Sequence, residues 1–135
     1  CIDTLYDIFD TTRHEDSVSL CKKYTLFPDL EDWKGKILLL ESSENQPNPE
    51  KYRKMLKALK QSGIFEVLSG VLVGKPMDER YAKEYQEILP EVIDNPTLPI
   101  VFNLNVGHAT PRAIIPFGIM AKVDILAQRI SFTEA

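Results

Sequence analysis

Two segments of the sequence carry side chains that could take part in acid–base chemistry. Glu41 lies in the segment LESSE at residues 40–44, and His108 lies in the segment LNVGHATP at residues 104–111. Each candidate follows a strongly apolar run. A histidine in such a loop can act as a general base or as a ligand, and a carboxylate that ends a buried run needs a hydrogen-bonding or charged partner. These two residues are therefore the first candidates for a functional site.

Each candidate also has an explanation without function. His108 can be a surface or packing histidine, and Glu41 can reach solvent from the end of its strand. Gly107 allows the backbone before His108 to turn sharply, and Pro111 stiffens the exit from the loop. The other histidine, His14, lies between two charged residues and is expected to be a solvated loop residue. The local pattern leaves both explanations open for Glu41 and His108.

Other residues give weaker signals. Glu44 and Glu50 are expected to have structural roles, as a loop acid and as an acid in the first turn of a helix. Ser42, Ser43 and Ser69 are poor candidates for a nucleophile because none lies on a glycine-flanked turn from a strand to a helix. The two histidines are distant in the sequence and the carboxylates are scattered, without the spacing of metal ligands. The sequence therefore predicts neither a metal nor a cofactor.

Three strands must position Glu41 and His108. Continuous apolar runs predict buried strands at residues 36–41, 67–73 and 98–104. Functional groups in open α/β sheets gather in the loops that follow the carboxyl ends of the strands. Both candidates occupy this position in the sequence, and they must converge at one edge of the sheet if they act together.

Helical patterns separate the three strands. Asn48 is expected to cap a helix that Gly63 ends, and Asp78 is expected to cap a helix that ends at Pro90. The last part of the chain predicts an antiparallel hairpin, formed by residues 119–125 and 128–133. This order predicts an α/β fold with a mixed sheet and helical crossovers.

The first third of the chain shows less pattern. Residues 1–9 have roughly helical spacing but no N-cap, as expected for an element cut at its start. Residues 11–23 and 27–33 are polar and mixed in charge, and they predict a surface connection.

Composition excludes several classes of protein. The chain has 135 residues, of which 44% are hydrophobic and 27% charged, and this is typical of one globular domain. A net charge of −4 leaves no basic surface for nucleic acid, and the apolar runs are too short to cross a membrane. The chain has two cysteines, no Cys-x-x-Cys motif and no signal-peptide pattern, so a cytoplasmic protein is expected.

The two candidate segments resemble one known family. Residues 37–44 with the following Pro47-Asn48-Pro49 look like the strand-and-acid motif of LD-carboxypeptidases and their microcin-immunity relatives. Residues 98–103, which lead to Gly107-His108 and Pro111, resemble the histidine motif of that family. The order of the elements between them also matches, so the resemblance covers roughly residues 1–133. The letters ESSE with the nearby prolines look closer to the microcin-immunity branch.

This resemblance implies a catalytic site divided between two domains. Members of the family use a Ser-His-Glu triad whose serine lies in an N-terminal domain and whose other two residues lie in a swivelling β/β/α-type C-terminal domain. Residues 1–135 would then be the C-terminal half, truncated at its N-terminal edge, with the nucleophile domain upstream. Glu41 would orient His108, and His108 would be the general base. The implied reaction is cleavage of an amide in an LD-muropeptide or a microcin-like peptidyl-nucleotide, by a protein that forms homodimers.

Two other functions are compatible with the sequence. The chain can be a non-catalytic module that binds a ligand or mediates dimerisation, and a metal hydrolase is a more distant third. If the resemblance holds, residues 1–135 alone should not hydrolyse amides, because the serine and the oxyanion-hole donors would come from the missing domain.

Overall fold

The computed structural model describes residues 1–133. A three-stranded parallel sheet forms the centre of the fold. Its strands are β1 (Ile37–Leu40), β2 (Gly70–Gly74) and β3 (Ile100–Leu104), in the spatial order β1-β2-β3. Because all three strands run in the same direction, their carboxyl ends lie at one edge. The segments that carry Glu41 and His108 both begin there.

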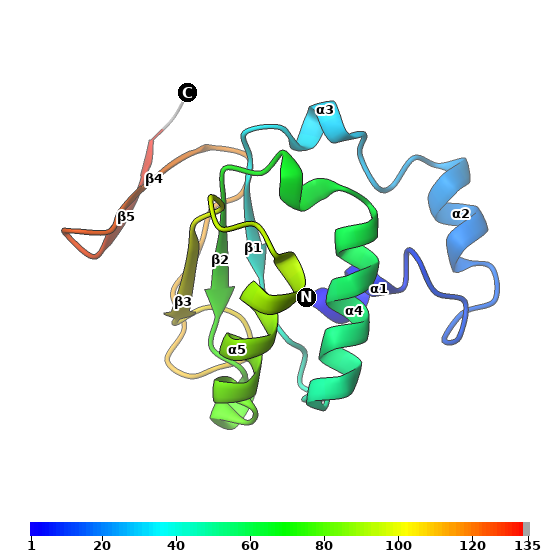
Figure 1. Cartoon of the computed structure of the whole chain (residues 1–135), viewed down its shortest axis with the longest axis horizontal. Coiled ribbons are helices and arrows are strands. Elements are labelled where there is room, and N and C mark those ends of the chain that lie inside the picture. The colour runs from blue at the N-terminus through cyan, green and yellow to red at the C-terminus, as the bar shows by residue number, and fades with distance from the viewer. Residues whose placement is uncertain (134–135) are drawn as a thin grey trace.

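Two amphipathic helices cover one face of this sheet (Figure 1). Helix α4 (Pro49–Gln61) connects β1 to β2, and α5 (Ala82–Ile93) connects β2 to β3. The side-chain oxygen of Asn48 accepts a hydrogen bond from the backbone N–H of Lys51 at 2.9 Å, as predicted for the N-cap. Gly63 follows the helix with a φ of +83°, as predicted for its end.

The apolar sides of α4, α5 and the sheet form the main core. The aromatic rings of Tyr52 and Tyr85 stack between the two helices at a centroid distance of 3.9 Å. The fully buried residues of this core come from α4 and α5, from β1, from the turn after α4 and from the N-terminal helix. They include Ile2, Leu40, Met55, Leu56, Leu59, Ile64, Leu89 and Ile93. The predicted crossovers therefore pack as the apolar periodicity requires.

The chain after β3 covers part of the opposite face. Leu72 is buried but lies outside the main core, because successive strand residues point to opposite sides of a sheet. Val106 and Ala109 are also buried outside that core, and they belong to the segment that follows β3. This segment leads from the site to the last two strands.

The predicted hairpin is confirmed. Strands β4 (Met120–Asp124) and β5 (Arg129–Thr133) pair antiparallel, and the backbone N–H of Ala127 donates to the Asp124 carboxylate in the turn. The hairpin projects away from the helices and the parallel sheet (Figure 1). The α/β class with parallel and antiparallel strands is thus confirmed, and the two kinds of strand form separate sheets.

Two predicted helix boundaries are wrong. Asp78 does not cap α5: it lies in a 3-10 turn (Met77–Glu79) with a φ of +55°, and its carboxylate instead accepts a hydrogen bond from the Gln46 amide. Pro90 does not end α5 but lies inside it. The helix continues past Pro90 because Val92 and Ile93 are buried in the core, which offsets the hydrogen bond that a proline cannot donate.

Short helices occupy the first third of the chain. They are α1 (Ile2–Tyr6), α2 (Ser17–Lys23) and α3 (Leu30–Trp33), with a further 3-10 turn at Ile64–Glu66 between α4 and β2. Helices α2 and α3 were not expected from the sequence. None of their residues is buried, so an apolar period is not required for them to form. Within residues 1–133, no helix has the length and apolar character that a membrane span requires.

Candidate active site

Glu41 and His108 come together at the carboxyl edge of the sheet. The Nδ1 atom of His108 lies 3.2 Å from Oε2 of Glu41, although the two residues are 67 positions apart in the sequence. Both side chains are partly buried, with exposed fractions of 24% for Glu41 and 33% for His108. The structure therefore brings together the two residues that the sequence analysis selected.

Gly107 makes this approach possible. Its φ is +87°, in the left-handed region that residues with a side chain seldom adopt. A Cβ atom at this position would overlap with Oε2 and Cδ of Glu41. The carboxylate thus lies directly against the backbone of residue 107, next to the ring that it contacts.

Gly74 has a comparable role at the end of the middle strand. Glu41 follows β1 and His108 follows β3, so the two loops must meet across the end of β2. A Cβ on Gly74 would lie 2.7 Å from the carbonyl oxygen of Val106 and 3.4 Å from Cβ of Glu41. Sequence reasoning did not identify Gly74, although a glycine that ends a buried strand indicates a close approach of another backbone.

A second carboxylate contacts the other nitrogen of the ring. Oε2 of Glu44 lies 3.1 Å from Nε2 of His108, and 64% of the Glu44 side chain is exposed. The prediction that Glu44 is only a structural loop acid missed this contact. Its position three residues after Glu41, in the same loop at the end of a strand, was the available signal.

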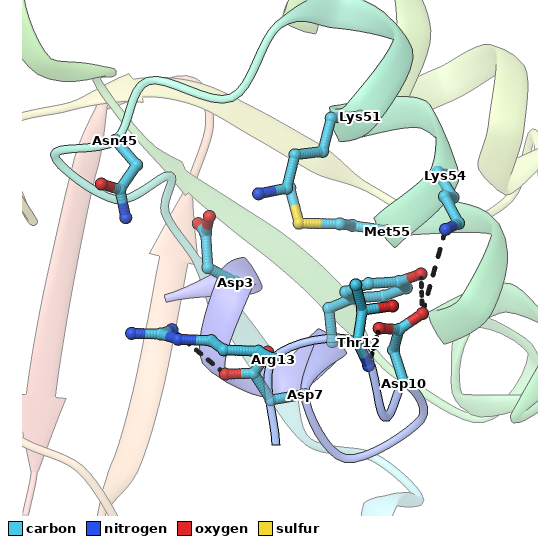
Figure 2. A pocket seen from close by; sticks show the side chains of 10 residues that line it. Asp3, Asp7, Asp10, Thr12, Arg13, Asn45, Lys51, Lys54 and Met55 are labelled. Atoms are coloured by element: carbon cyan, nitrogen blue, oxygen red, sulfur yellow. Dashed lines mark hydrogen bonds and ion pairs between the residues drawn. The ribbon is translucent and has the colours of Figure 1, made fainter. Parts of the chain in front are cut away.

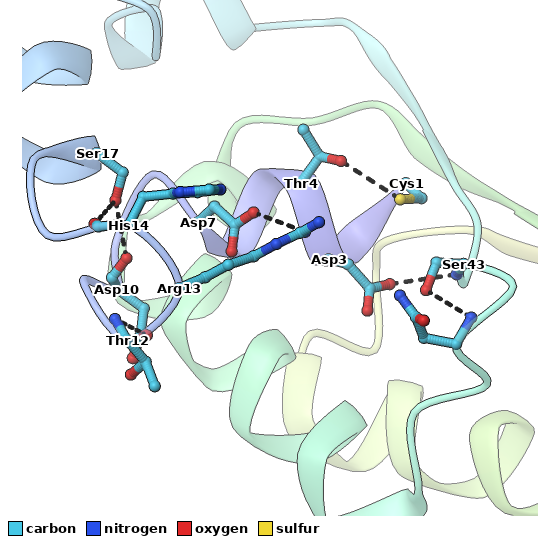
Figure 3. A network of polar contacts seen from close by, with 11 residues as sticks. Cys1, Asp3, Thr4, Asp7, Asp10, Thr12, Arg13, His14, Ser17 and Ser43 are labelled. Atoms are coloured by element: carbon cyan, nitrogen blue, oxygen red, sulfur yellow. Dashed lines mark hydrogen bonds and ion pairs between the residues drawn. The ribbon is translucent and has the colours of Figure 1, made fainter.

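The loop that carries Glu41 is anchored from behind. The carbonyl oxygen of Glu41 accepts a hydrogen bond from the backbone N–H of Ile2 at 2.8 Å, which ties α1 to the end of β1. The buried carboxylate of Asp3 accepts a hydrogen bond from the backbone N–H of Ser43 at 3.2 Å (Figure 3). On the other side, the Tyr85 hydroxyl donates to the carbonyl of Pro47. These contacts fix the backbone that presents Glu41.

The remaining sequence candidates lie elsewhere. Ser42 and Ser43 are buried, and Ser69 precedes β2 at the end of the sheet opposite the site. His14 is exposed in the loop between α1 and α2, as predicted. Among residues 1–133, no group of three or more His, Cys, Asp or Glu side chains is arranged to hold a metal ion. Glu41 and Glu44 contact different nitrogens of His108 and do not converge on a common point.

A separate polar cluster lies beside a cavity of about 500 Å³ between α1 and α4 (Figure 2). The Tyr6 hydroxyl donates to the Asp10 carboxylate at 2.7 Å, and the Lys54 ammonium lies 3.9 Å from the same carboxylate. Hydrogen bonds from Thr12 and Tyr6 lower the pKa of Asp10 to about 2. Burial and the hydrogen bond to Asp10 raise the pKa of Tyr6. We refer to Tyr6, Asp10, Thr12 and Lys54 as the α1 cluster.

This arrangement at the sheet edge has the geometry of two members of a catalytic triad. A carboxylate at Nδ1 holds the ring and favours the tautomer that carries its proton there. When the Glu44 contact is absent, that tautomer leaves Nε2 as the nitrogen that can accept a proton from a nucleophile. The nucleophile itself has no candidate among the described serines at this edge.

Comparisons with known proteins agree with this geometry. The profile of the LD-carboxypeptidase C-terminal domain matches residues 14–123. The Microcin C7 self-immunity protein MccF of Escherichia coli is 27% identical over 103 residues, which are 74% of this chain and 29% of that protein.

A solved structure is much more similar. The crystal structure of an MccF-like protein from Streptococcus pneumoniae in complex with AMP is 59% identical, has a TM-score of 0.96, and is matched by 98% of this chain. The chain spans 38% of the length of that protein. Since the family profile covers most of the sequence and the fold agrees throughout, the chain belongs to the family of LD-carboxypeptidase C-terminal domains.

Proposed function

We propose that Glu41 and His108 are the acid and the general base of a serine-type amide hydrolase, whose nucleophile comes from a part of the protein outside residues 1–135. The main observation that supports this proposal is the contact of 3.2 Å between Nδ1 of His108 and Oε2 of Glu41. The two relatives support the division of the site, because this chain spans 29% and 38% of their lengths. A preceding domain would also have to supply the donors of the oxyanion hole.

In the proposed reaction His108 moves one proton in each half of the cycle. Its Nε2 atom takes the proton of the serine hydroxyl as the serine oxygen attacks the carbonyl carbon of the substrate amide. The resulting imidazolium then donates that proton to the leaving amine as the C–N bond breaks. Water attacks the acyl-serine in the second half, again with His108 as the base, and releases the acid. Glu41 stabilises the imidazolium throughout and keeps its ring in place.

The proposed substrate is a peptide with an amide next to a carboxylate, or a peptidyl-nucleotide. The family profile supports a peptidase, and the similar structure from Streptococcus pneumoniae was solved in complex with AMP. We also expect a cytoplasmic protein, since both cysteines of the chain are free thiols.

Substitution of His108 tests this function in the natural protein that contains the chain. We expect His108→Ala to lower turnover of an LD-tetrapeptide or a peptidyl-nucleotide by about 10³-fold or more. The matched control is His14→Ala, which removes an exposed histidine far from the sheet edge and should leave turnover unchanged. Turnover by His108→Ala at the wild-type rate would remove His108 from the mechanism.

Residues 1–135 on their own should be inactive if the site is divided in this way. Without the serine and the oxyanion-hole donors, this chain should give no measurable hydrolysis of either substrate. Robust turnover by the purified chain would contradict the division of the site.

A second candidate function is assembly, and the exposed apolar residues near the hairpin favour it. Ile114, Phe117, Ile125 and Leu126 are 95%, 78%, 70% and 98% exposed. Soluble monomers seldom expose large apolar side chains in such a cluster along the chain. We propose that this segment contributes to a homodimer contact. Sedimentation velocity on the natural protein should then show that Leu126→Asp weakens the dimer, and an unchanged dimer would reject this role for the segment.

A further inference from the structure

We propose that Glu44 is a positioning residue that holds Nε2 of His108 in the free site and must release it before the nucleophile can be activated. This inference rests on the proposed function, because it concerns the same nitrogen that would accept the serine proton. The carboxylate of Glu44 lies 3.1 Å from that nitrogen. As long as the contact persists, Nε2 is not available to a serine hydroxyl.

The two carboxylates that contact the ring are held very differently. Glu41 lies against the backbone of Gly107, and its exposed fraction is 24%. Glu44 has an exposed fraction of 64%, and among residues 1–133 its carboxylate has no hydrogen bond or ion pair other than the contact with His108. Glu41 is therefore a fixed partner of the ring, and Glu44 is a displaceable one.

The backbone that carries Glu44 is nevertheless well defined. The backbone N–H of Asn45 donates to the Ser43 hydroxyl at 3.3 Å, and the backbone N–H of Gln46 donates to the Ser43 carbonyl at 3.1 Å. These bonds close a tight turn around residue 44. Because a carboxylate oxygen only accepts hydrogen bonds, the contact with Glu44 requires a proton on Nε2. Release of Nε2 as a base therefore needs rotation of the Glu44 side chain, which occurs within nanoseconds for exposed residues, and transfer of the Nε2 proton to water. Neither step needs a loop rearrangement.

The contact should reduce the reactivity of the free enzyme. If only a fraction of molecules has Nε2 open, the apparent rate of nucleophile activation falls in proportion to that fraction. Removal of the Glu44 carboxylate should then increase the rate at which the serine reacts, because every molecule has the open arrangement. A merely structural role for Glu44 would leave the rate unchanged or lower it.

A fluorophosphonate that labels activated serines can test this without knowledge of the natural substrate. In the natural protein, we expect Glu44→Ala to increase the second-order rate constant of labelling by about 5- to 10-fold, equivalent to an open fraction of roughly 10–20% in the wild type. The matched control is Glu50→Ala, which removes another exposed carboxylate, in the first turn of α4, and should not change the rate. Glu44→Gln keeps the size of the side chain and should give an intermediate rate.

The outcomes separate this inference from the proposed function. Slow labelling of His108→Ala, together with labelling of Glu44→Ala at or below the wild-type rate, would overturn the role of Glu44 and leave the general base in place. Labelling of His108→Ala at the wild-type rate, or absence of labelling in the wild type, would overturn the proposed function and the inference that rests on it. Faster labelling of Glu44→Ala that depends on His108 would support both.

Discussion

The Glu41–His108 site and the α1 cluster differ in how their polar side chains are brought together. The α1 cluster forms mainly between close neighbours in the sequence: Tyr6 and Asp10 are four positions apart, and Thr12 follows two positions later. Glu41 and His108 are 67 positions apart and meet only because β1, β2 and β3 end at the same edge. The first arrangement needs one loop and the Lys54 side chain from α4, and the second needs all three strands of the sheet.

The two regions also differ in the features that are commonly used to recognise a functional site. The α1 cluster contains Asp10, whose pKa is strongly lowered, and it lies beside a cavity of about 500 Å³. The lowered pKa is explained by hydrogen bonds from Thr12 and Tyr6, which are close neighbours of Asp10 in the sequence. The Glu41–His108 site is instead marked by convergence of two strand ends and by two glycines that leave space for it. If the proposed function holds, backbone geometry indicates the active site of this protein better than a shifted pKa does.

The largest difference between the two regions is expected in the turnover of a Gly107 variant. In Gly107→Ala, the new Cβ would overlap with the Glu41 carboxylate and displace it from the His108 ring. We expect turnover by the natural protein to fall about 100-fold, as expected when a catalytic group is misplaced by roughly 1 Å.

Gly118→Ala is the matched control for this substitution. Gly118 also has a positive φ, of +75°, but a Cβ there would have no neighbour within 4 Å. It therefore reproduces the backbone strain without the overlap, and it should keep turnover close to that of the wild type. Equal losses in the two variants would mean that strain, and not the position of Glu41, determines the effect.

A smaller effect is expected at Gly74. In Gly74→Ala, the Cβ would press on the carbonyl of Val106 and so push the His108 loop away from Glu41. We expect turnover to fall about 10-fold, and the free energy of unfolding in urea to fall by about 1–3 kcal/mol. Gly70→Ala, whose nearest neighbour would be the Pro99 carbonyl at 3.4 Å, should change both quantities much less. Comparable losses at the two glycines would argue against the role of Gly74 at the site.

The α1 cluster should respond in stability and not in catalysis. Tyr6→Phe removes the hydroxyl that donates to Asp10, so the free energy of unfolding should fall by about 0.5–1.5 kcal/mol. Turnover should stay within about two-fold of the wild type if the cluster is structural. A large loss of turnover in a folded Tyr6→Phe variant would show that the α1 cluster belongs to the active site after all.

The smallest expected effect is the pH dependence that Asp10 contributes. Its pKa of about 2 in the folded protein is below its ordinary value of 3.8, so its charged form stabilises the fold above pH 4, and this contribution is lost as the pH falls from 4 to 2. The difference in unfolding free energy between the wild type and Asp10→Asn should be constant from pH 5 to 7 and shrink below pH 4. A difference that grows on acidification would contradict the lowered pKa.

Much of the fold was readable from the sequence because it depends on local patterns. The apolar runs of β1 and β3, the Asn48 cap and the Gly63 end follow from residue type and period. Asp78 and Pro90 failed as boundaries because contacts distant in sequence decided them: a hydrogen bond from Gln46 in one case and burial of the last turn of α5 in the other. Propensity does not contain this information.

The candidate site was readable only in part for the same reason. Glu41 and His108 could be selected because each follows an apolar strand, and the family resemblance then paired them. Glu44 and Gly74 were missed, since their importance depends on where the His108 loop lies after folding. The position of Glu44 in the loop after β1 places it near the candidate site, but it does not distinguish a carboxylate that reaches a histidine from one that reaches solvent.

The most direct test of the central claim is a double-mutant cycle on Glu41 and His108 in the natural protein. If the two residues act as one unit, Glu41→Gln should lower turnover by about 10³-fold, and the variant that combines it with His108→Ala should be no slower than His108→Ala alone. Circular dichroism should show that all three variants remain folded. Losses that multiply in the double variant would mean that the two residues act independently, and they would contradict the pairing seen at the edge of the sheet.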